Sequence, residues 1–331
     1  MPFPREKSPA IVMMGSSNPG KELFVLDLEI QTVPEQITNT GGNLIDFSTS
    51  PDGKRIVFSA HNKHGGADLW IIKSDGKKAA IAQACGASRC TAPAWSPDQK
   101  TIAYTYEDAA DKTPYITLFD LSHQESSPLH EASNPEPGSD PTWSPDGKWI
   151  AYWNIAQENI QVIRPDSQQR FFLDSASGDA GSWAADSNSL YYADLLIRPP
   201  IFQSVILRAA VESPDIPIEL DLTADGEEVS IAQPVCHPKE AVIAATLQGN
   251  IRVAGRQLVE IDLDSGQRKT ISSDLSKIPS DMAWSHDGNL MVYQLNPGDN
   301  RAAKTEVKIW DRSSGTSTTV AEGFQHPAWL R

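Results

Sequence analysis

One short pattern recurs along the whole chain and constrains its fold more than any other feature. In the clearest copies an aromatic residue precedes Ser-Pro-Asp-Gly or a close variant, and an alternating apolar run follows. Pro presets the turn backbone, Asp bonds to its own backbone, and Gly accepts a positive φ. Each copy therefore predicts a tight turn leading into a strand packed on its faces. The anchors of the seven copies are Phe47, Trp95, Trp143, Trp183, Val235, Trp284 and Trp329.

The spacing of the copies indicates a repeat protein. The anchors recur at intervals of about 40 to 50 residues, which is the range of propeller repeats. Further strand-like runs follow each turn, for example at 69–75, 115–120, 258–264 and 307–311. Four strands per repeat make one blade. The repeated turn aspartates, such as Asp52, Asp146 and Asp287, are expected to serve the turns themselves.

The two ends of the chain complement each other. Residues 10–38 hold the later strands of a repeat without an anchor, and the C-terminus holds an anchor with no strands after it. We therefore predict an all-β, seven-bladed β-propeller with four-stranded antiparallel blades, occupying residues 1–331 as a single domain. Its C-terminal strand would complete the N-terminal blade and close the ring, which protects sheet edges. An open solenoid with two capped ends is the alternative.

These repeats resemble those of the TolB-like propellers, which are sometimes grouped with WD-like repeats. The resemblance is clearest around Phe47, Trp95, Trp143 and Trp284 and covers the chain from about residue 10 onward. It implies a binding scaffold and favours an extracytoplasmic, periplasmic location. Related propellers also gate serine peptidases whose catalytic groups lie on an attached domain. The chain contains no Gly-x-Ser-x-Gly nucleophile motif.

The amino-acid composition limits the kinds of partner that the protein could bind. The formal net charge is −15, from 43 acidic and 28 basic residues, and such a surface repels nucleic acid and anionic lipid. It is compatible with a cationic ligand or a basic protein or peptide. No apolar run approaches the length of a membrane span, and no signal peptide is visible at the start. We expect a monomer that binds no nucleic acid and does not span a membrane.

Two of the three cysteines lie close together in sequence. Cys85 and Cys90 flank a short loop that a disulfide could close, and such a bond would indicate an oxidising compartment. Reduced thiols in that loop remain the alternative. Cys236 stands in an apolar stretch, which is typical of a small buried side chain.

Candidate binding residues precede the anchors, where propeller loops converge on the mouth of the central channel. Three residues upstream of their anchors stand Asp140, Asp281 and His326, and four upstream stand Asn43 and Asp179. Gathered at one opening, such carboxylates would suit calcium, another divalent cation or a cationic group on a ligand. The alternative is that these are wetted channel residues or turn caps. No cofactor is required by any motif.

Two functions remain open. The first is a non-catalytic scaffold that binds a protein or peptide at the channel mouth or rim, because no catalytic motif is present. The second is a carbohydrate-active lyase or hydrolase that uses the channel-mouth carboxylates, His326 and a divalent cation. Metal ligands around the channel would favour the second function, and a dry channel blocked by Leu44 and Ile231 would favour the first.

Overall fold

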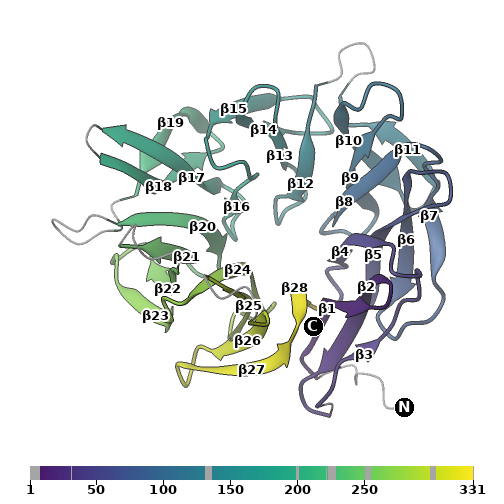
Figure 1. Cartoon of the computed structure of the whole chain (residues 1–331). Coiled ribbons are helices and arrows are strands. Elements are labelled where there is room, and N and C mark those ends of the chain that lie inside the picture. The colour runs from purple at the N-terminus through teal and green to yellow at the C-terminus, as the bar shows by residue number, and fades with distance from the viewer. Residues whose placement is uncertain are drawn as a thin grey trace. The chain divides into compact units, whose positions relative to one another are not determined.

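The computed structural model describes residues 8–30, 32–130, 136–198, 201–220, 222, 229–249, 255–298 and 303–330. Its regular elements are β-strands (Figure 1). The chain divides into two compact units, one made of Met1–Phe171 with Ala328–Arg331 and the other of Phe172–Pro327. No helix in the described ranges is long and apolar enough to cross a membrane.

The first unit begins with a four-stranded sheet in the order β28-β1-β2-β3. An eight-stranded sheet and a four-stranded sheet in the order β12-β13-β14-β15 follow. Their strands are β1 (Ala10–Ser17), β2 (Gly20–Asp27), β3 (Glu35–Gln36), β4 (Leu44–Thr49), β5 (Arg55–His61), β6 (Ala67–Lys73), β7 (Ala80–Gln83), β8 (Arg89–Trp95), β9 (Thr101–Glu107), β10 (Pro114–Asp120), β11 (Glu125–Pro128), β12 (Ser139–Trp143), β13 (Ile150–Asn154), β14 (Asn159–Ile163), β15 (Arg170–Asp174) and β28 (Phe324–Trp329). The boundaries between the two units fall within β15, after Phe171, and within β28, after Pro327.

The eight-stranded sheet consists of two antiparallel meanders. Strands β4 to β7 pair in chain order, and so do β8 to β11. A single parallel pair, Ala67 with Arg89, joins the two meanders. Each meander has the four antiparallel strands that the repeat predicts.

The second unit contains three four-stranded antiparallel sheets, each in chain order. Their strands are β16 (Ser182–Trp183), β17 (Ser189–Arg198), β18 (Ile201–Ala210), β19 (Ser213–Glu219), β20 (Ser230–Cys236), β21 (Val242–Gln248), β22 (Gln257–Asp262), β23 (Arg268–Ser272), β24 (Lys277–Trp284), β25 (Leu290–Pro297), β26 (Glu306–Asp311) and β27 (Thr316–Glu322). The predicted all-β class with four-stranded antiparallel sheets is confirmed.

The repeated turns form as the sequence predicts. Ser50 Oγ donates to Asp52 Oδ1 at 2.7 Å, and the same carboxyl oxygen accepts the Lys54 N–H at 3.1 Å. Gly53, with a φ of 65°, donates its N–H to the Ser50 carbonyl. The turns at Asp98, Asp146 and Asp287 repeat the serine and backbone bonds to the carboxylate. These aspartates are therefore occupied within their own turns.

Anchor indoles connect neighbouring repeats inside each unit. Trp143 Nε1 donates to the Ala94 carbonyl at 3.2 Å, and Ala94 directly precedes the anchor Trp95. In the same way Trp95 Nε1 donates to the Ser48 carbonyl, and Trp284 Nε1 donates to the Val235 carbonyl. Because each accepting carbonyl belongs to the residue before an anchor, Thr49 and Cys236 are the anchors equivalent to Trp95. The aromatic alignment, which centred two repeats near Phe47 and Val235, was displaced by two residues and by one.

The turn hydrogen bonds give the same register for the weakest repeat. His237 N–H donates to the Val242 carbonyl, as Ser285 N–H does to Leu290. The ring of His237 takes the place of the turn aspartate, because its Nδ1 accepts the N–H groups of Lys239 at 3.2 Å and Glu240 at 3.0 Å. A local aromatic signal is thus weaker evidence of register than turn chemistry.

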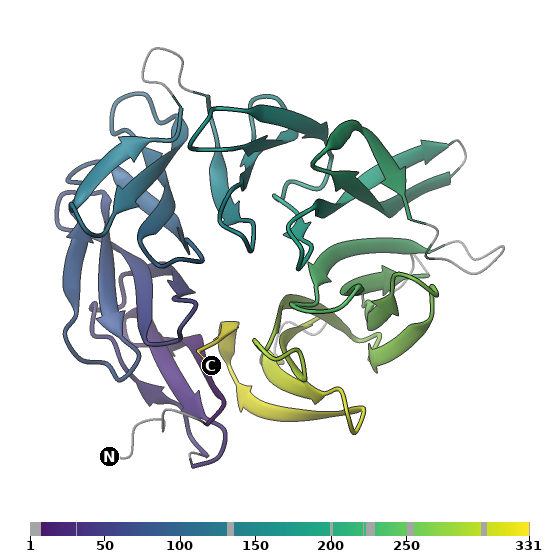
Figure 2. The same ribbon diagram turned by 180° about the vertical axis from the view of Figure 1, so that it is seen from behind.

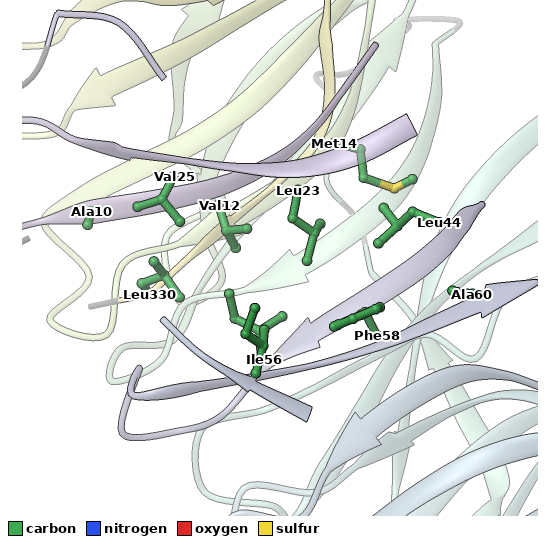
Figure 3. Packing of buried hydrophobic residues seen from close by; sticks show 11 residues of the cluster. Ala10, Val12, Met14, Leu23, Val25, Leu44, Ile56, Phe58, Ala60 and Leu330 are labelled. Atoms are coloured by element: carbon green, nitrogen blue, oxygen red, sulfur yellow. The ribbon is translucent and has the colours of Figure 1, made fainter. Parts of the chain in front are cut away.

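The C-terminal strand joins the N-terminal sheet, as the complementary ends predict. Strand β28 lies beside β1 in both views (Figures 1 and 2). The Leu330 N–H donates to the Ala10 carbonyl at 2.9 Å. The Leu330 side chain is fully buried with Val12, Val25 and Ile56 in an apolar cluster (Figure 3). The two chain ends therefore share one core.

Candidate functional site

A β-bulge recurs shortly before the anchors in the innermost strands. The register shifts by one residue in β8, β12, β20 and β24. At these bulges Ala92, Asp140, Gln233 and Asp281 adopt a φ between 48° and 55°, and His326 on β28 has a φ of 50°. Bulges re-aim side chains, and left-handed residues other than glycine are concentrated at functional sites. The bulge residues therefore form the candidate functional positions.

Side chains stabilise the unusual bulge backbone. The Ala92 N–H donates to Asp46 Oδ2 at 2.8 Å, and the Asp140 N–H donates to Thr105 Oγ1 at 3.1 Å. The His326 N–H donates to Gln294 Oε1 at 2.8 Å. Each bond satisfies a donor that the bulge removes from the strand ladder. Specific side-chain hydrogen bonds therefore stabilise the backbone at these positions.

Replacing Ala92 with glycine tests the strain at a bulge. A left-handed backbone costs an alanine roughly 1–2 kcal/mol, whereas glycine adopts it freely. The glycine variant also loses about 0.4–1 kcal/mol of stability, because glycine raises the conformational entropy of the unfolded chain. We expect Ala92→Gly to leave the free energy of unfolding unchanged or raise it by up to about 1 kcal/mol, measured by urea denaturation.

The matched control for that substitution is Ala94→Gly on the same strand, which lacks the positive φ. Glycine in a strand is destabilising by roughly 0.5–1 kcal/mol. Equal losses of stability in the two variants would contradict bulge strain at Ala92.

Two aspartates of the first unit interact electrostatically. Asp46 accepts hydrogen bonds from Ser59 Oγ and the Ala92 N–H. Burial raises the pKa of Asp46, and the negative charge of Asp140 raises it further, against the lowering effect of those two donors. Asp140 is exposed, and its Oδ2 accepts the Ser139 hydroxyl at 2.7 Å. The charge of Asp140 therefore acts on the carboxyl group of Asp46.

Sequence alignment on the aromatic residues missed Asp46. With Phe47 as anchor, the candidate position falls on Leu44 or Asn43, whereas the correct anchor Thr49 places Asp46 three residues upstream. Aligning the turn serines Ser50 and Ser96 instead would have found it. The signal was therefore present in the turn and not in the aromatic residue.

Asn43 and Asp179 serve their own loops. Asn43 Nδ2 donates to the Thr40 carbonyl at 2.8 Å, and the Asn43 backbone carbonyl accepts the His61 N–H. Asp179 Oδ1 accepts the Gly181 N–H at 2.8 Å. These contacts match the turn-cap alternative for both residues.

In the second unit the predicted residues Asp281 and His326 are in contact. His326 Nδ1 lies 2.9 Å from Asp281 Oδ1, and the Ser280 hydroxyl donates to Asp281 Oδ2 at 2.7 Å. Asn296 Nδ2 donates to Ser280 Oγ, and Gln294 Nε2 donates to Asn296 Oδ1. Since Gln294 also accepts the His326 N–H, the five residues form a closed network. This network fixes the imidazole while its side chain stays half exposed.

The contact determines the ionisation of Asp281. Burial alone would raise the pKa of this carboxyl, but the hydrogen bond and charge of His326, with the Ser280 hydroxyl, lower it below its ordinary value. A lowered folded pKa contributes stability above the unfolded pKa, and this contribution is lost as the pH falls through the folded pKa. We expect His326→Ala to raise the pKa of Asp281, measured by carbon-detected NMR titration of the side-chain carboxyl.

The same titration contains its control. The pKa of Asp287, lowered chiefly by Ser285 and the Asn289 N–H within its turn, should be unchanged in His326→Ala. An unchanged Asp281 pKa in the variant would show that the imidazole does not stabilise this carboxylate.

The site residues belong to both units, with Asn43, Asp46 and Asp140 in the first and Asp179, Asp281 and His326 in the second. Their gathering around one opening stays a prediction. The described part of the chain contains no group of three or more histidine, cysteine, aspartate or glutamate side chains that could hold a metal ion.

The cysteines are arranged as one bonded pair and one thiol. Cys85 and Cys90 form a disulfide. The Cys85 N–H and Asn62 Nδ2 both donate to Asp68 Oδ1 at 2.8 Å, which fixes the bonded loop against β6. Burial raises the pKa of Cys236 to about 12, so its thiol stays protonated and is a poor nucleophile at neutral pH.

Comparison with known proteins identifies related folds. Residues 7–187 match the family model described as PD40, TolB beta propeller domain. TolB from Acinetobacter baumannii has a TM-score of 0.54 at 19% identity, over 97% of this chain and 83% of that one. A puromycin-hydrolyzing peptidase from Mycobacterium tuberculosis has a TM-score of 0.66 at 12% identity, over 96% of this chain and 53% of that one.

A structure from a study of two prolyl endopeptidases has a TM-score of 0.64 at 13% identity, over 97% of this chain and 50% of that one. The chain thus spans about half the length of these peptidases. At such identities the likeness concerns the fold alone. No curated protein sequence matches the chain.

Proposed function

Since this chain belongs to the TolB β-propeller family, we propose that it is a non-catalytic scaffold whose inner-strand bulges hold a peptide or protein partner. The observation that carries the proposal is the recurrence of charged or polar side chains at left-handed bulge positions. Asp140 and Asp281 occupy such positions, and His326 on β28 has the same left-handed φ. The Asp140 N–H donates to Thr105 Oγ1, the His326 N–H donates to Gln294 Oε1, and the Asp281 carboxylate contacts the His326 ring. Fixed polar groups give specificity to a binding surface without any catalytic step.

The charge of these positions favours a basic partner. Asp46, Asp140 and Asp281 supply carboxylates, and the chain carries a formal charge of −15. Complementary charge speeds association and selects partners, especially at low ionic strength. We therefore propose that the partner presents lysine or arginine side chains to the bulges.

Selection from a random peptide library tests this proposal. Immobilised protein is panned at low salt, and the enriched peptides are titrated by calorimetry against Asp140→Asn and Asp281→Asn. We expect enrichment in lysine or arginine, with affinity at least about tenfold weaker in the variants. Asp111→Asn, at an exposed turn aspartate, is the matched control and should bind as the parent does. Enriched peptides that bind all four proteins equally would refute the bulge site.

We also propose seven blades in one propeller domain. Five four-stranded sheets and two four-stranded meanders supply seven equivalent units, and the meanders share one parallel pair. Hydrogen exchange offers a test, because two blades should protect β4–β7 and β8–β11 as separate cooperative groups. Identical opening energies across all eight strands would instead favour one continuous sheet.

A second candidate function rests on the contact between Asp281 and His326. A carboxylate that bonds to Nδ1 fixes the imidazole so that its other nitrogen can accept a proton. This arrangement suits the alternative of a carbohydrate-active lyase that abstracts a proton beside a carboxylate of an acidic sugar. An ultraviolet assay for unsaturated products from uronic-acid polysaccharides tests it, with His326→Ala as the inactive variant. Absence of product with and without added calcium would exclude this activity for the substrates assayed.

We propose that the protein is a monomer in an oxidising, extracytoplasmic compartment. The Cys85–Cys90 disulfide and the TolB family both favour this location. Alkylation without prior reduction, followed by mass spectrometry, should label Cys236 alone in unfolded protein isolated from its native cells. Light scattering should give the 36.1 kDa mass of one chain. Labelling of all three cysteines, or a doubled mass, would refute the corresponding proposal.

A further inference from the structure

A separate cavity lies within the first unit, against the meander β8–β11. It has a volume of about 390 Å³, which is within the range of small-molecule sites in proteins. None of the bulge residues described above lines it. Its walls come mainly from β9 and β10, with Gln83 of β7 and Ser126 of β11 at one end.

Three tyrosines form the aromatic wall of this cavity. Tyr106 on β9 stands directly opposite Tyr115 on β10, and Tyr104 stands opposite Thr117. Opposed residues, and residues two apart on one strand, share the same face of a sheet. The strand register therefore brings all three phenol rings to the cavity side by side.

One end of the cavity has its polar groups already bonded to each other. The Tyr104 hydroxyl donates to Ser126 Oγ at 3.1 Å, and the Ser126 hydroxyl donates to Gln83 Oε1 at 2.9 Å. Since each hydroxyl donates its single hydrogen within this series of hydrogen bonds, few donors at this end of the cavity are free to bind a ligand. This end of the cavity can therefore form only one or two hydrogen bonds with a ligand.

The other end is electrically balanced. Glu136 contributes a carboxylate to the lining, and Arg170 pairs with it. His130 is buried, and its Nε2 lies 2.6 Å from the Tyr152 hydroxyl. Burial lowers the pKa of His130, against the raising effect of Glu136, so the imidazole is neutral at pH 7. Neither end therefore offers an unbalanced charge to a ligand.

We propose that this cavity binds an uncharged aromatic ring that stacks on Tyr106 and Tyr115. A cation gains little here, because the Glu136 carboxylate is neutralised by Arg170. A sugar would leave several hydroxyls without partners, which costs free energy for each one. An aromatic ring replaces water on the tyrosine faces and needs few hydrogen bonds. The ring comes from a free small molecule or from an aromatic side chain of a peptide.

Ligand-observed NMR and calorimetry on the full chain test this site with four probes. Indole represents the free aromatic molecule, and the peptide Gly-Gly-Trp-Gly-Gly represents a side chain. Tetramethylammonium and cellobiose represent a cation and a sugar. We expect indole or the peptide to bind saturably with a dissociation constant below roughly 1 mM. Tighter binding of the peptide would assign the site to a side chain, and binding of indole alone would assign it to a small molecule.

Two variants link the binding to the cavity. Tyr115→Ala should weaken the bound aromatic probe at least about tenfold, because it removes one stacking face. Ser126→Phe, at an exposed edge-strand position, should fill the cavity and abolish binding while the protein stays folded by circular dichroism. Phe172→Ala removes an exposed aromatic residue elsewhere and should leave binding unchanged. Failure of both aromatic probes, preference for the cation or sugar, or equal binding by all variants would overturn the proposal.

Discussion

Deletion of residues 327–331 is expected to lower the free energy of unfolding by more than about 5 kcal/mol, enough to unfold a domain of ordinary stability. The deletion removes the fully buried Leu330 and the nearly buried Trp329. It also removes the bond from the Leu330 N–H to the Ala10 carbonyl, and it exposes one edge of β1. Urea denaturation followed by tryptophan fluorescence and circular dichroism measures the loss.

Two variants separate the causes of that loss. Leu330→Ala keeps the backbone pairing and creates a cavity in the cluster with Val12, Val25 and Ile56, so it should cost about 2–5 kcal/mol. Deletion of Arg331 alone should have little effect. A 327–331 deletion that unfolds at the same urea concentration as the parent would show that the N-terminal sheet is stable without its C-terminal strand.

Replacement of Glu22 with alanine is expected to cost about 3 kcal/mol or more. The Glu22 side chain is buried at 1% exposure. Its carboxylate accepts the Thr38 hydroxyl at 2.6 Å, the Thr40 N–H at 2.7 Å, the Thr40 hydroxyl at 3.0 Å and the Gly42 N–H at 2.9 Å. Alanine leaves these donors without a buried acceptor, and the segment before β4 loses its side-chain bonds to β2 while the bonds from Leu23 N–H to Thr38 Oγ1 and from Lys21 N–H to the Gly42 carbonyl remain.

The conservative variant distinguishes hydrogen bonding from packing at this position. Glu22→Gln keeps the size and one carbonyl oxygen, so its loss of stability should lie between those of the parent and Glu22→Ala. Glu29→Ala, at an exposed position of the same sheet region, should change stability by less than about 0.5 kcal/mol. Equal stability of Glu22→Ala and Glu29→Ala in urea denaturation would contradict the role assigned to the buried carboxylate.

Local sequence signals were sufficient to predict the turns and strands of the repeat. The turns at Asp52, Asp98, Asp146 and Asp287 follow from hydrogen bonds between residues two to five apart, and such bonds depend only on nearby residues. The same local signals predicted the strand class, the four strands of each sheet and the pairing of the C-terminal strand with the N-terminal sheet. The short loop between Cys85 and Cys90, which are five positions apart, allowed either a disulfide or reduced thiols, and the structure has the disulfide.

The alignment of the repeats and the contacts between distant polar groups depend on tertiary packing. The true anchors Thr49 and Cys236 are defined by neighbouring indole groups whose bonds join residues 47 to 49 positions apart. His326 meets Asp281 across 45 residues, and the tyrosine wall depends on the register of β9 with β10. Local propensity carries no information about such distant partners, since sheet packing and the bulges set them. For this reason the sequence located Asp281 and His326 but not their contact, and it missed Asp46.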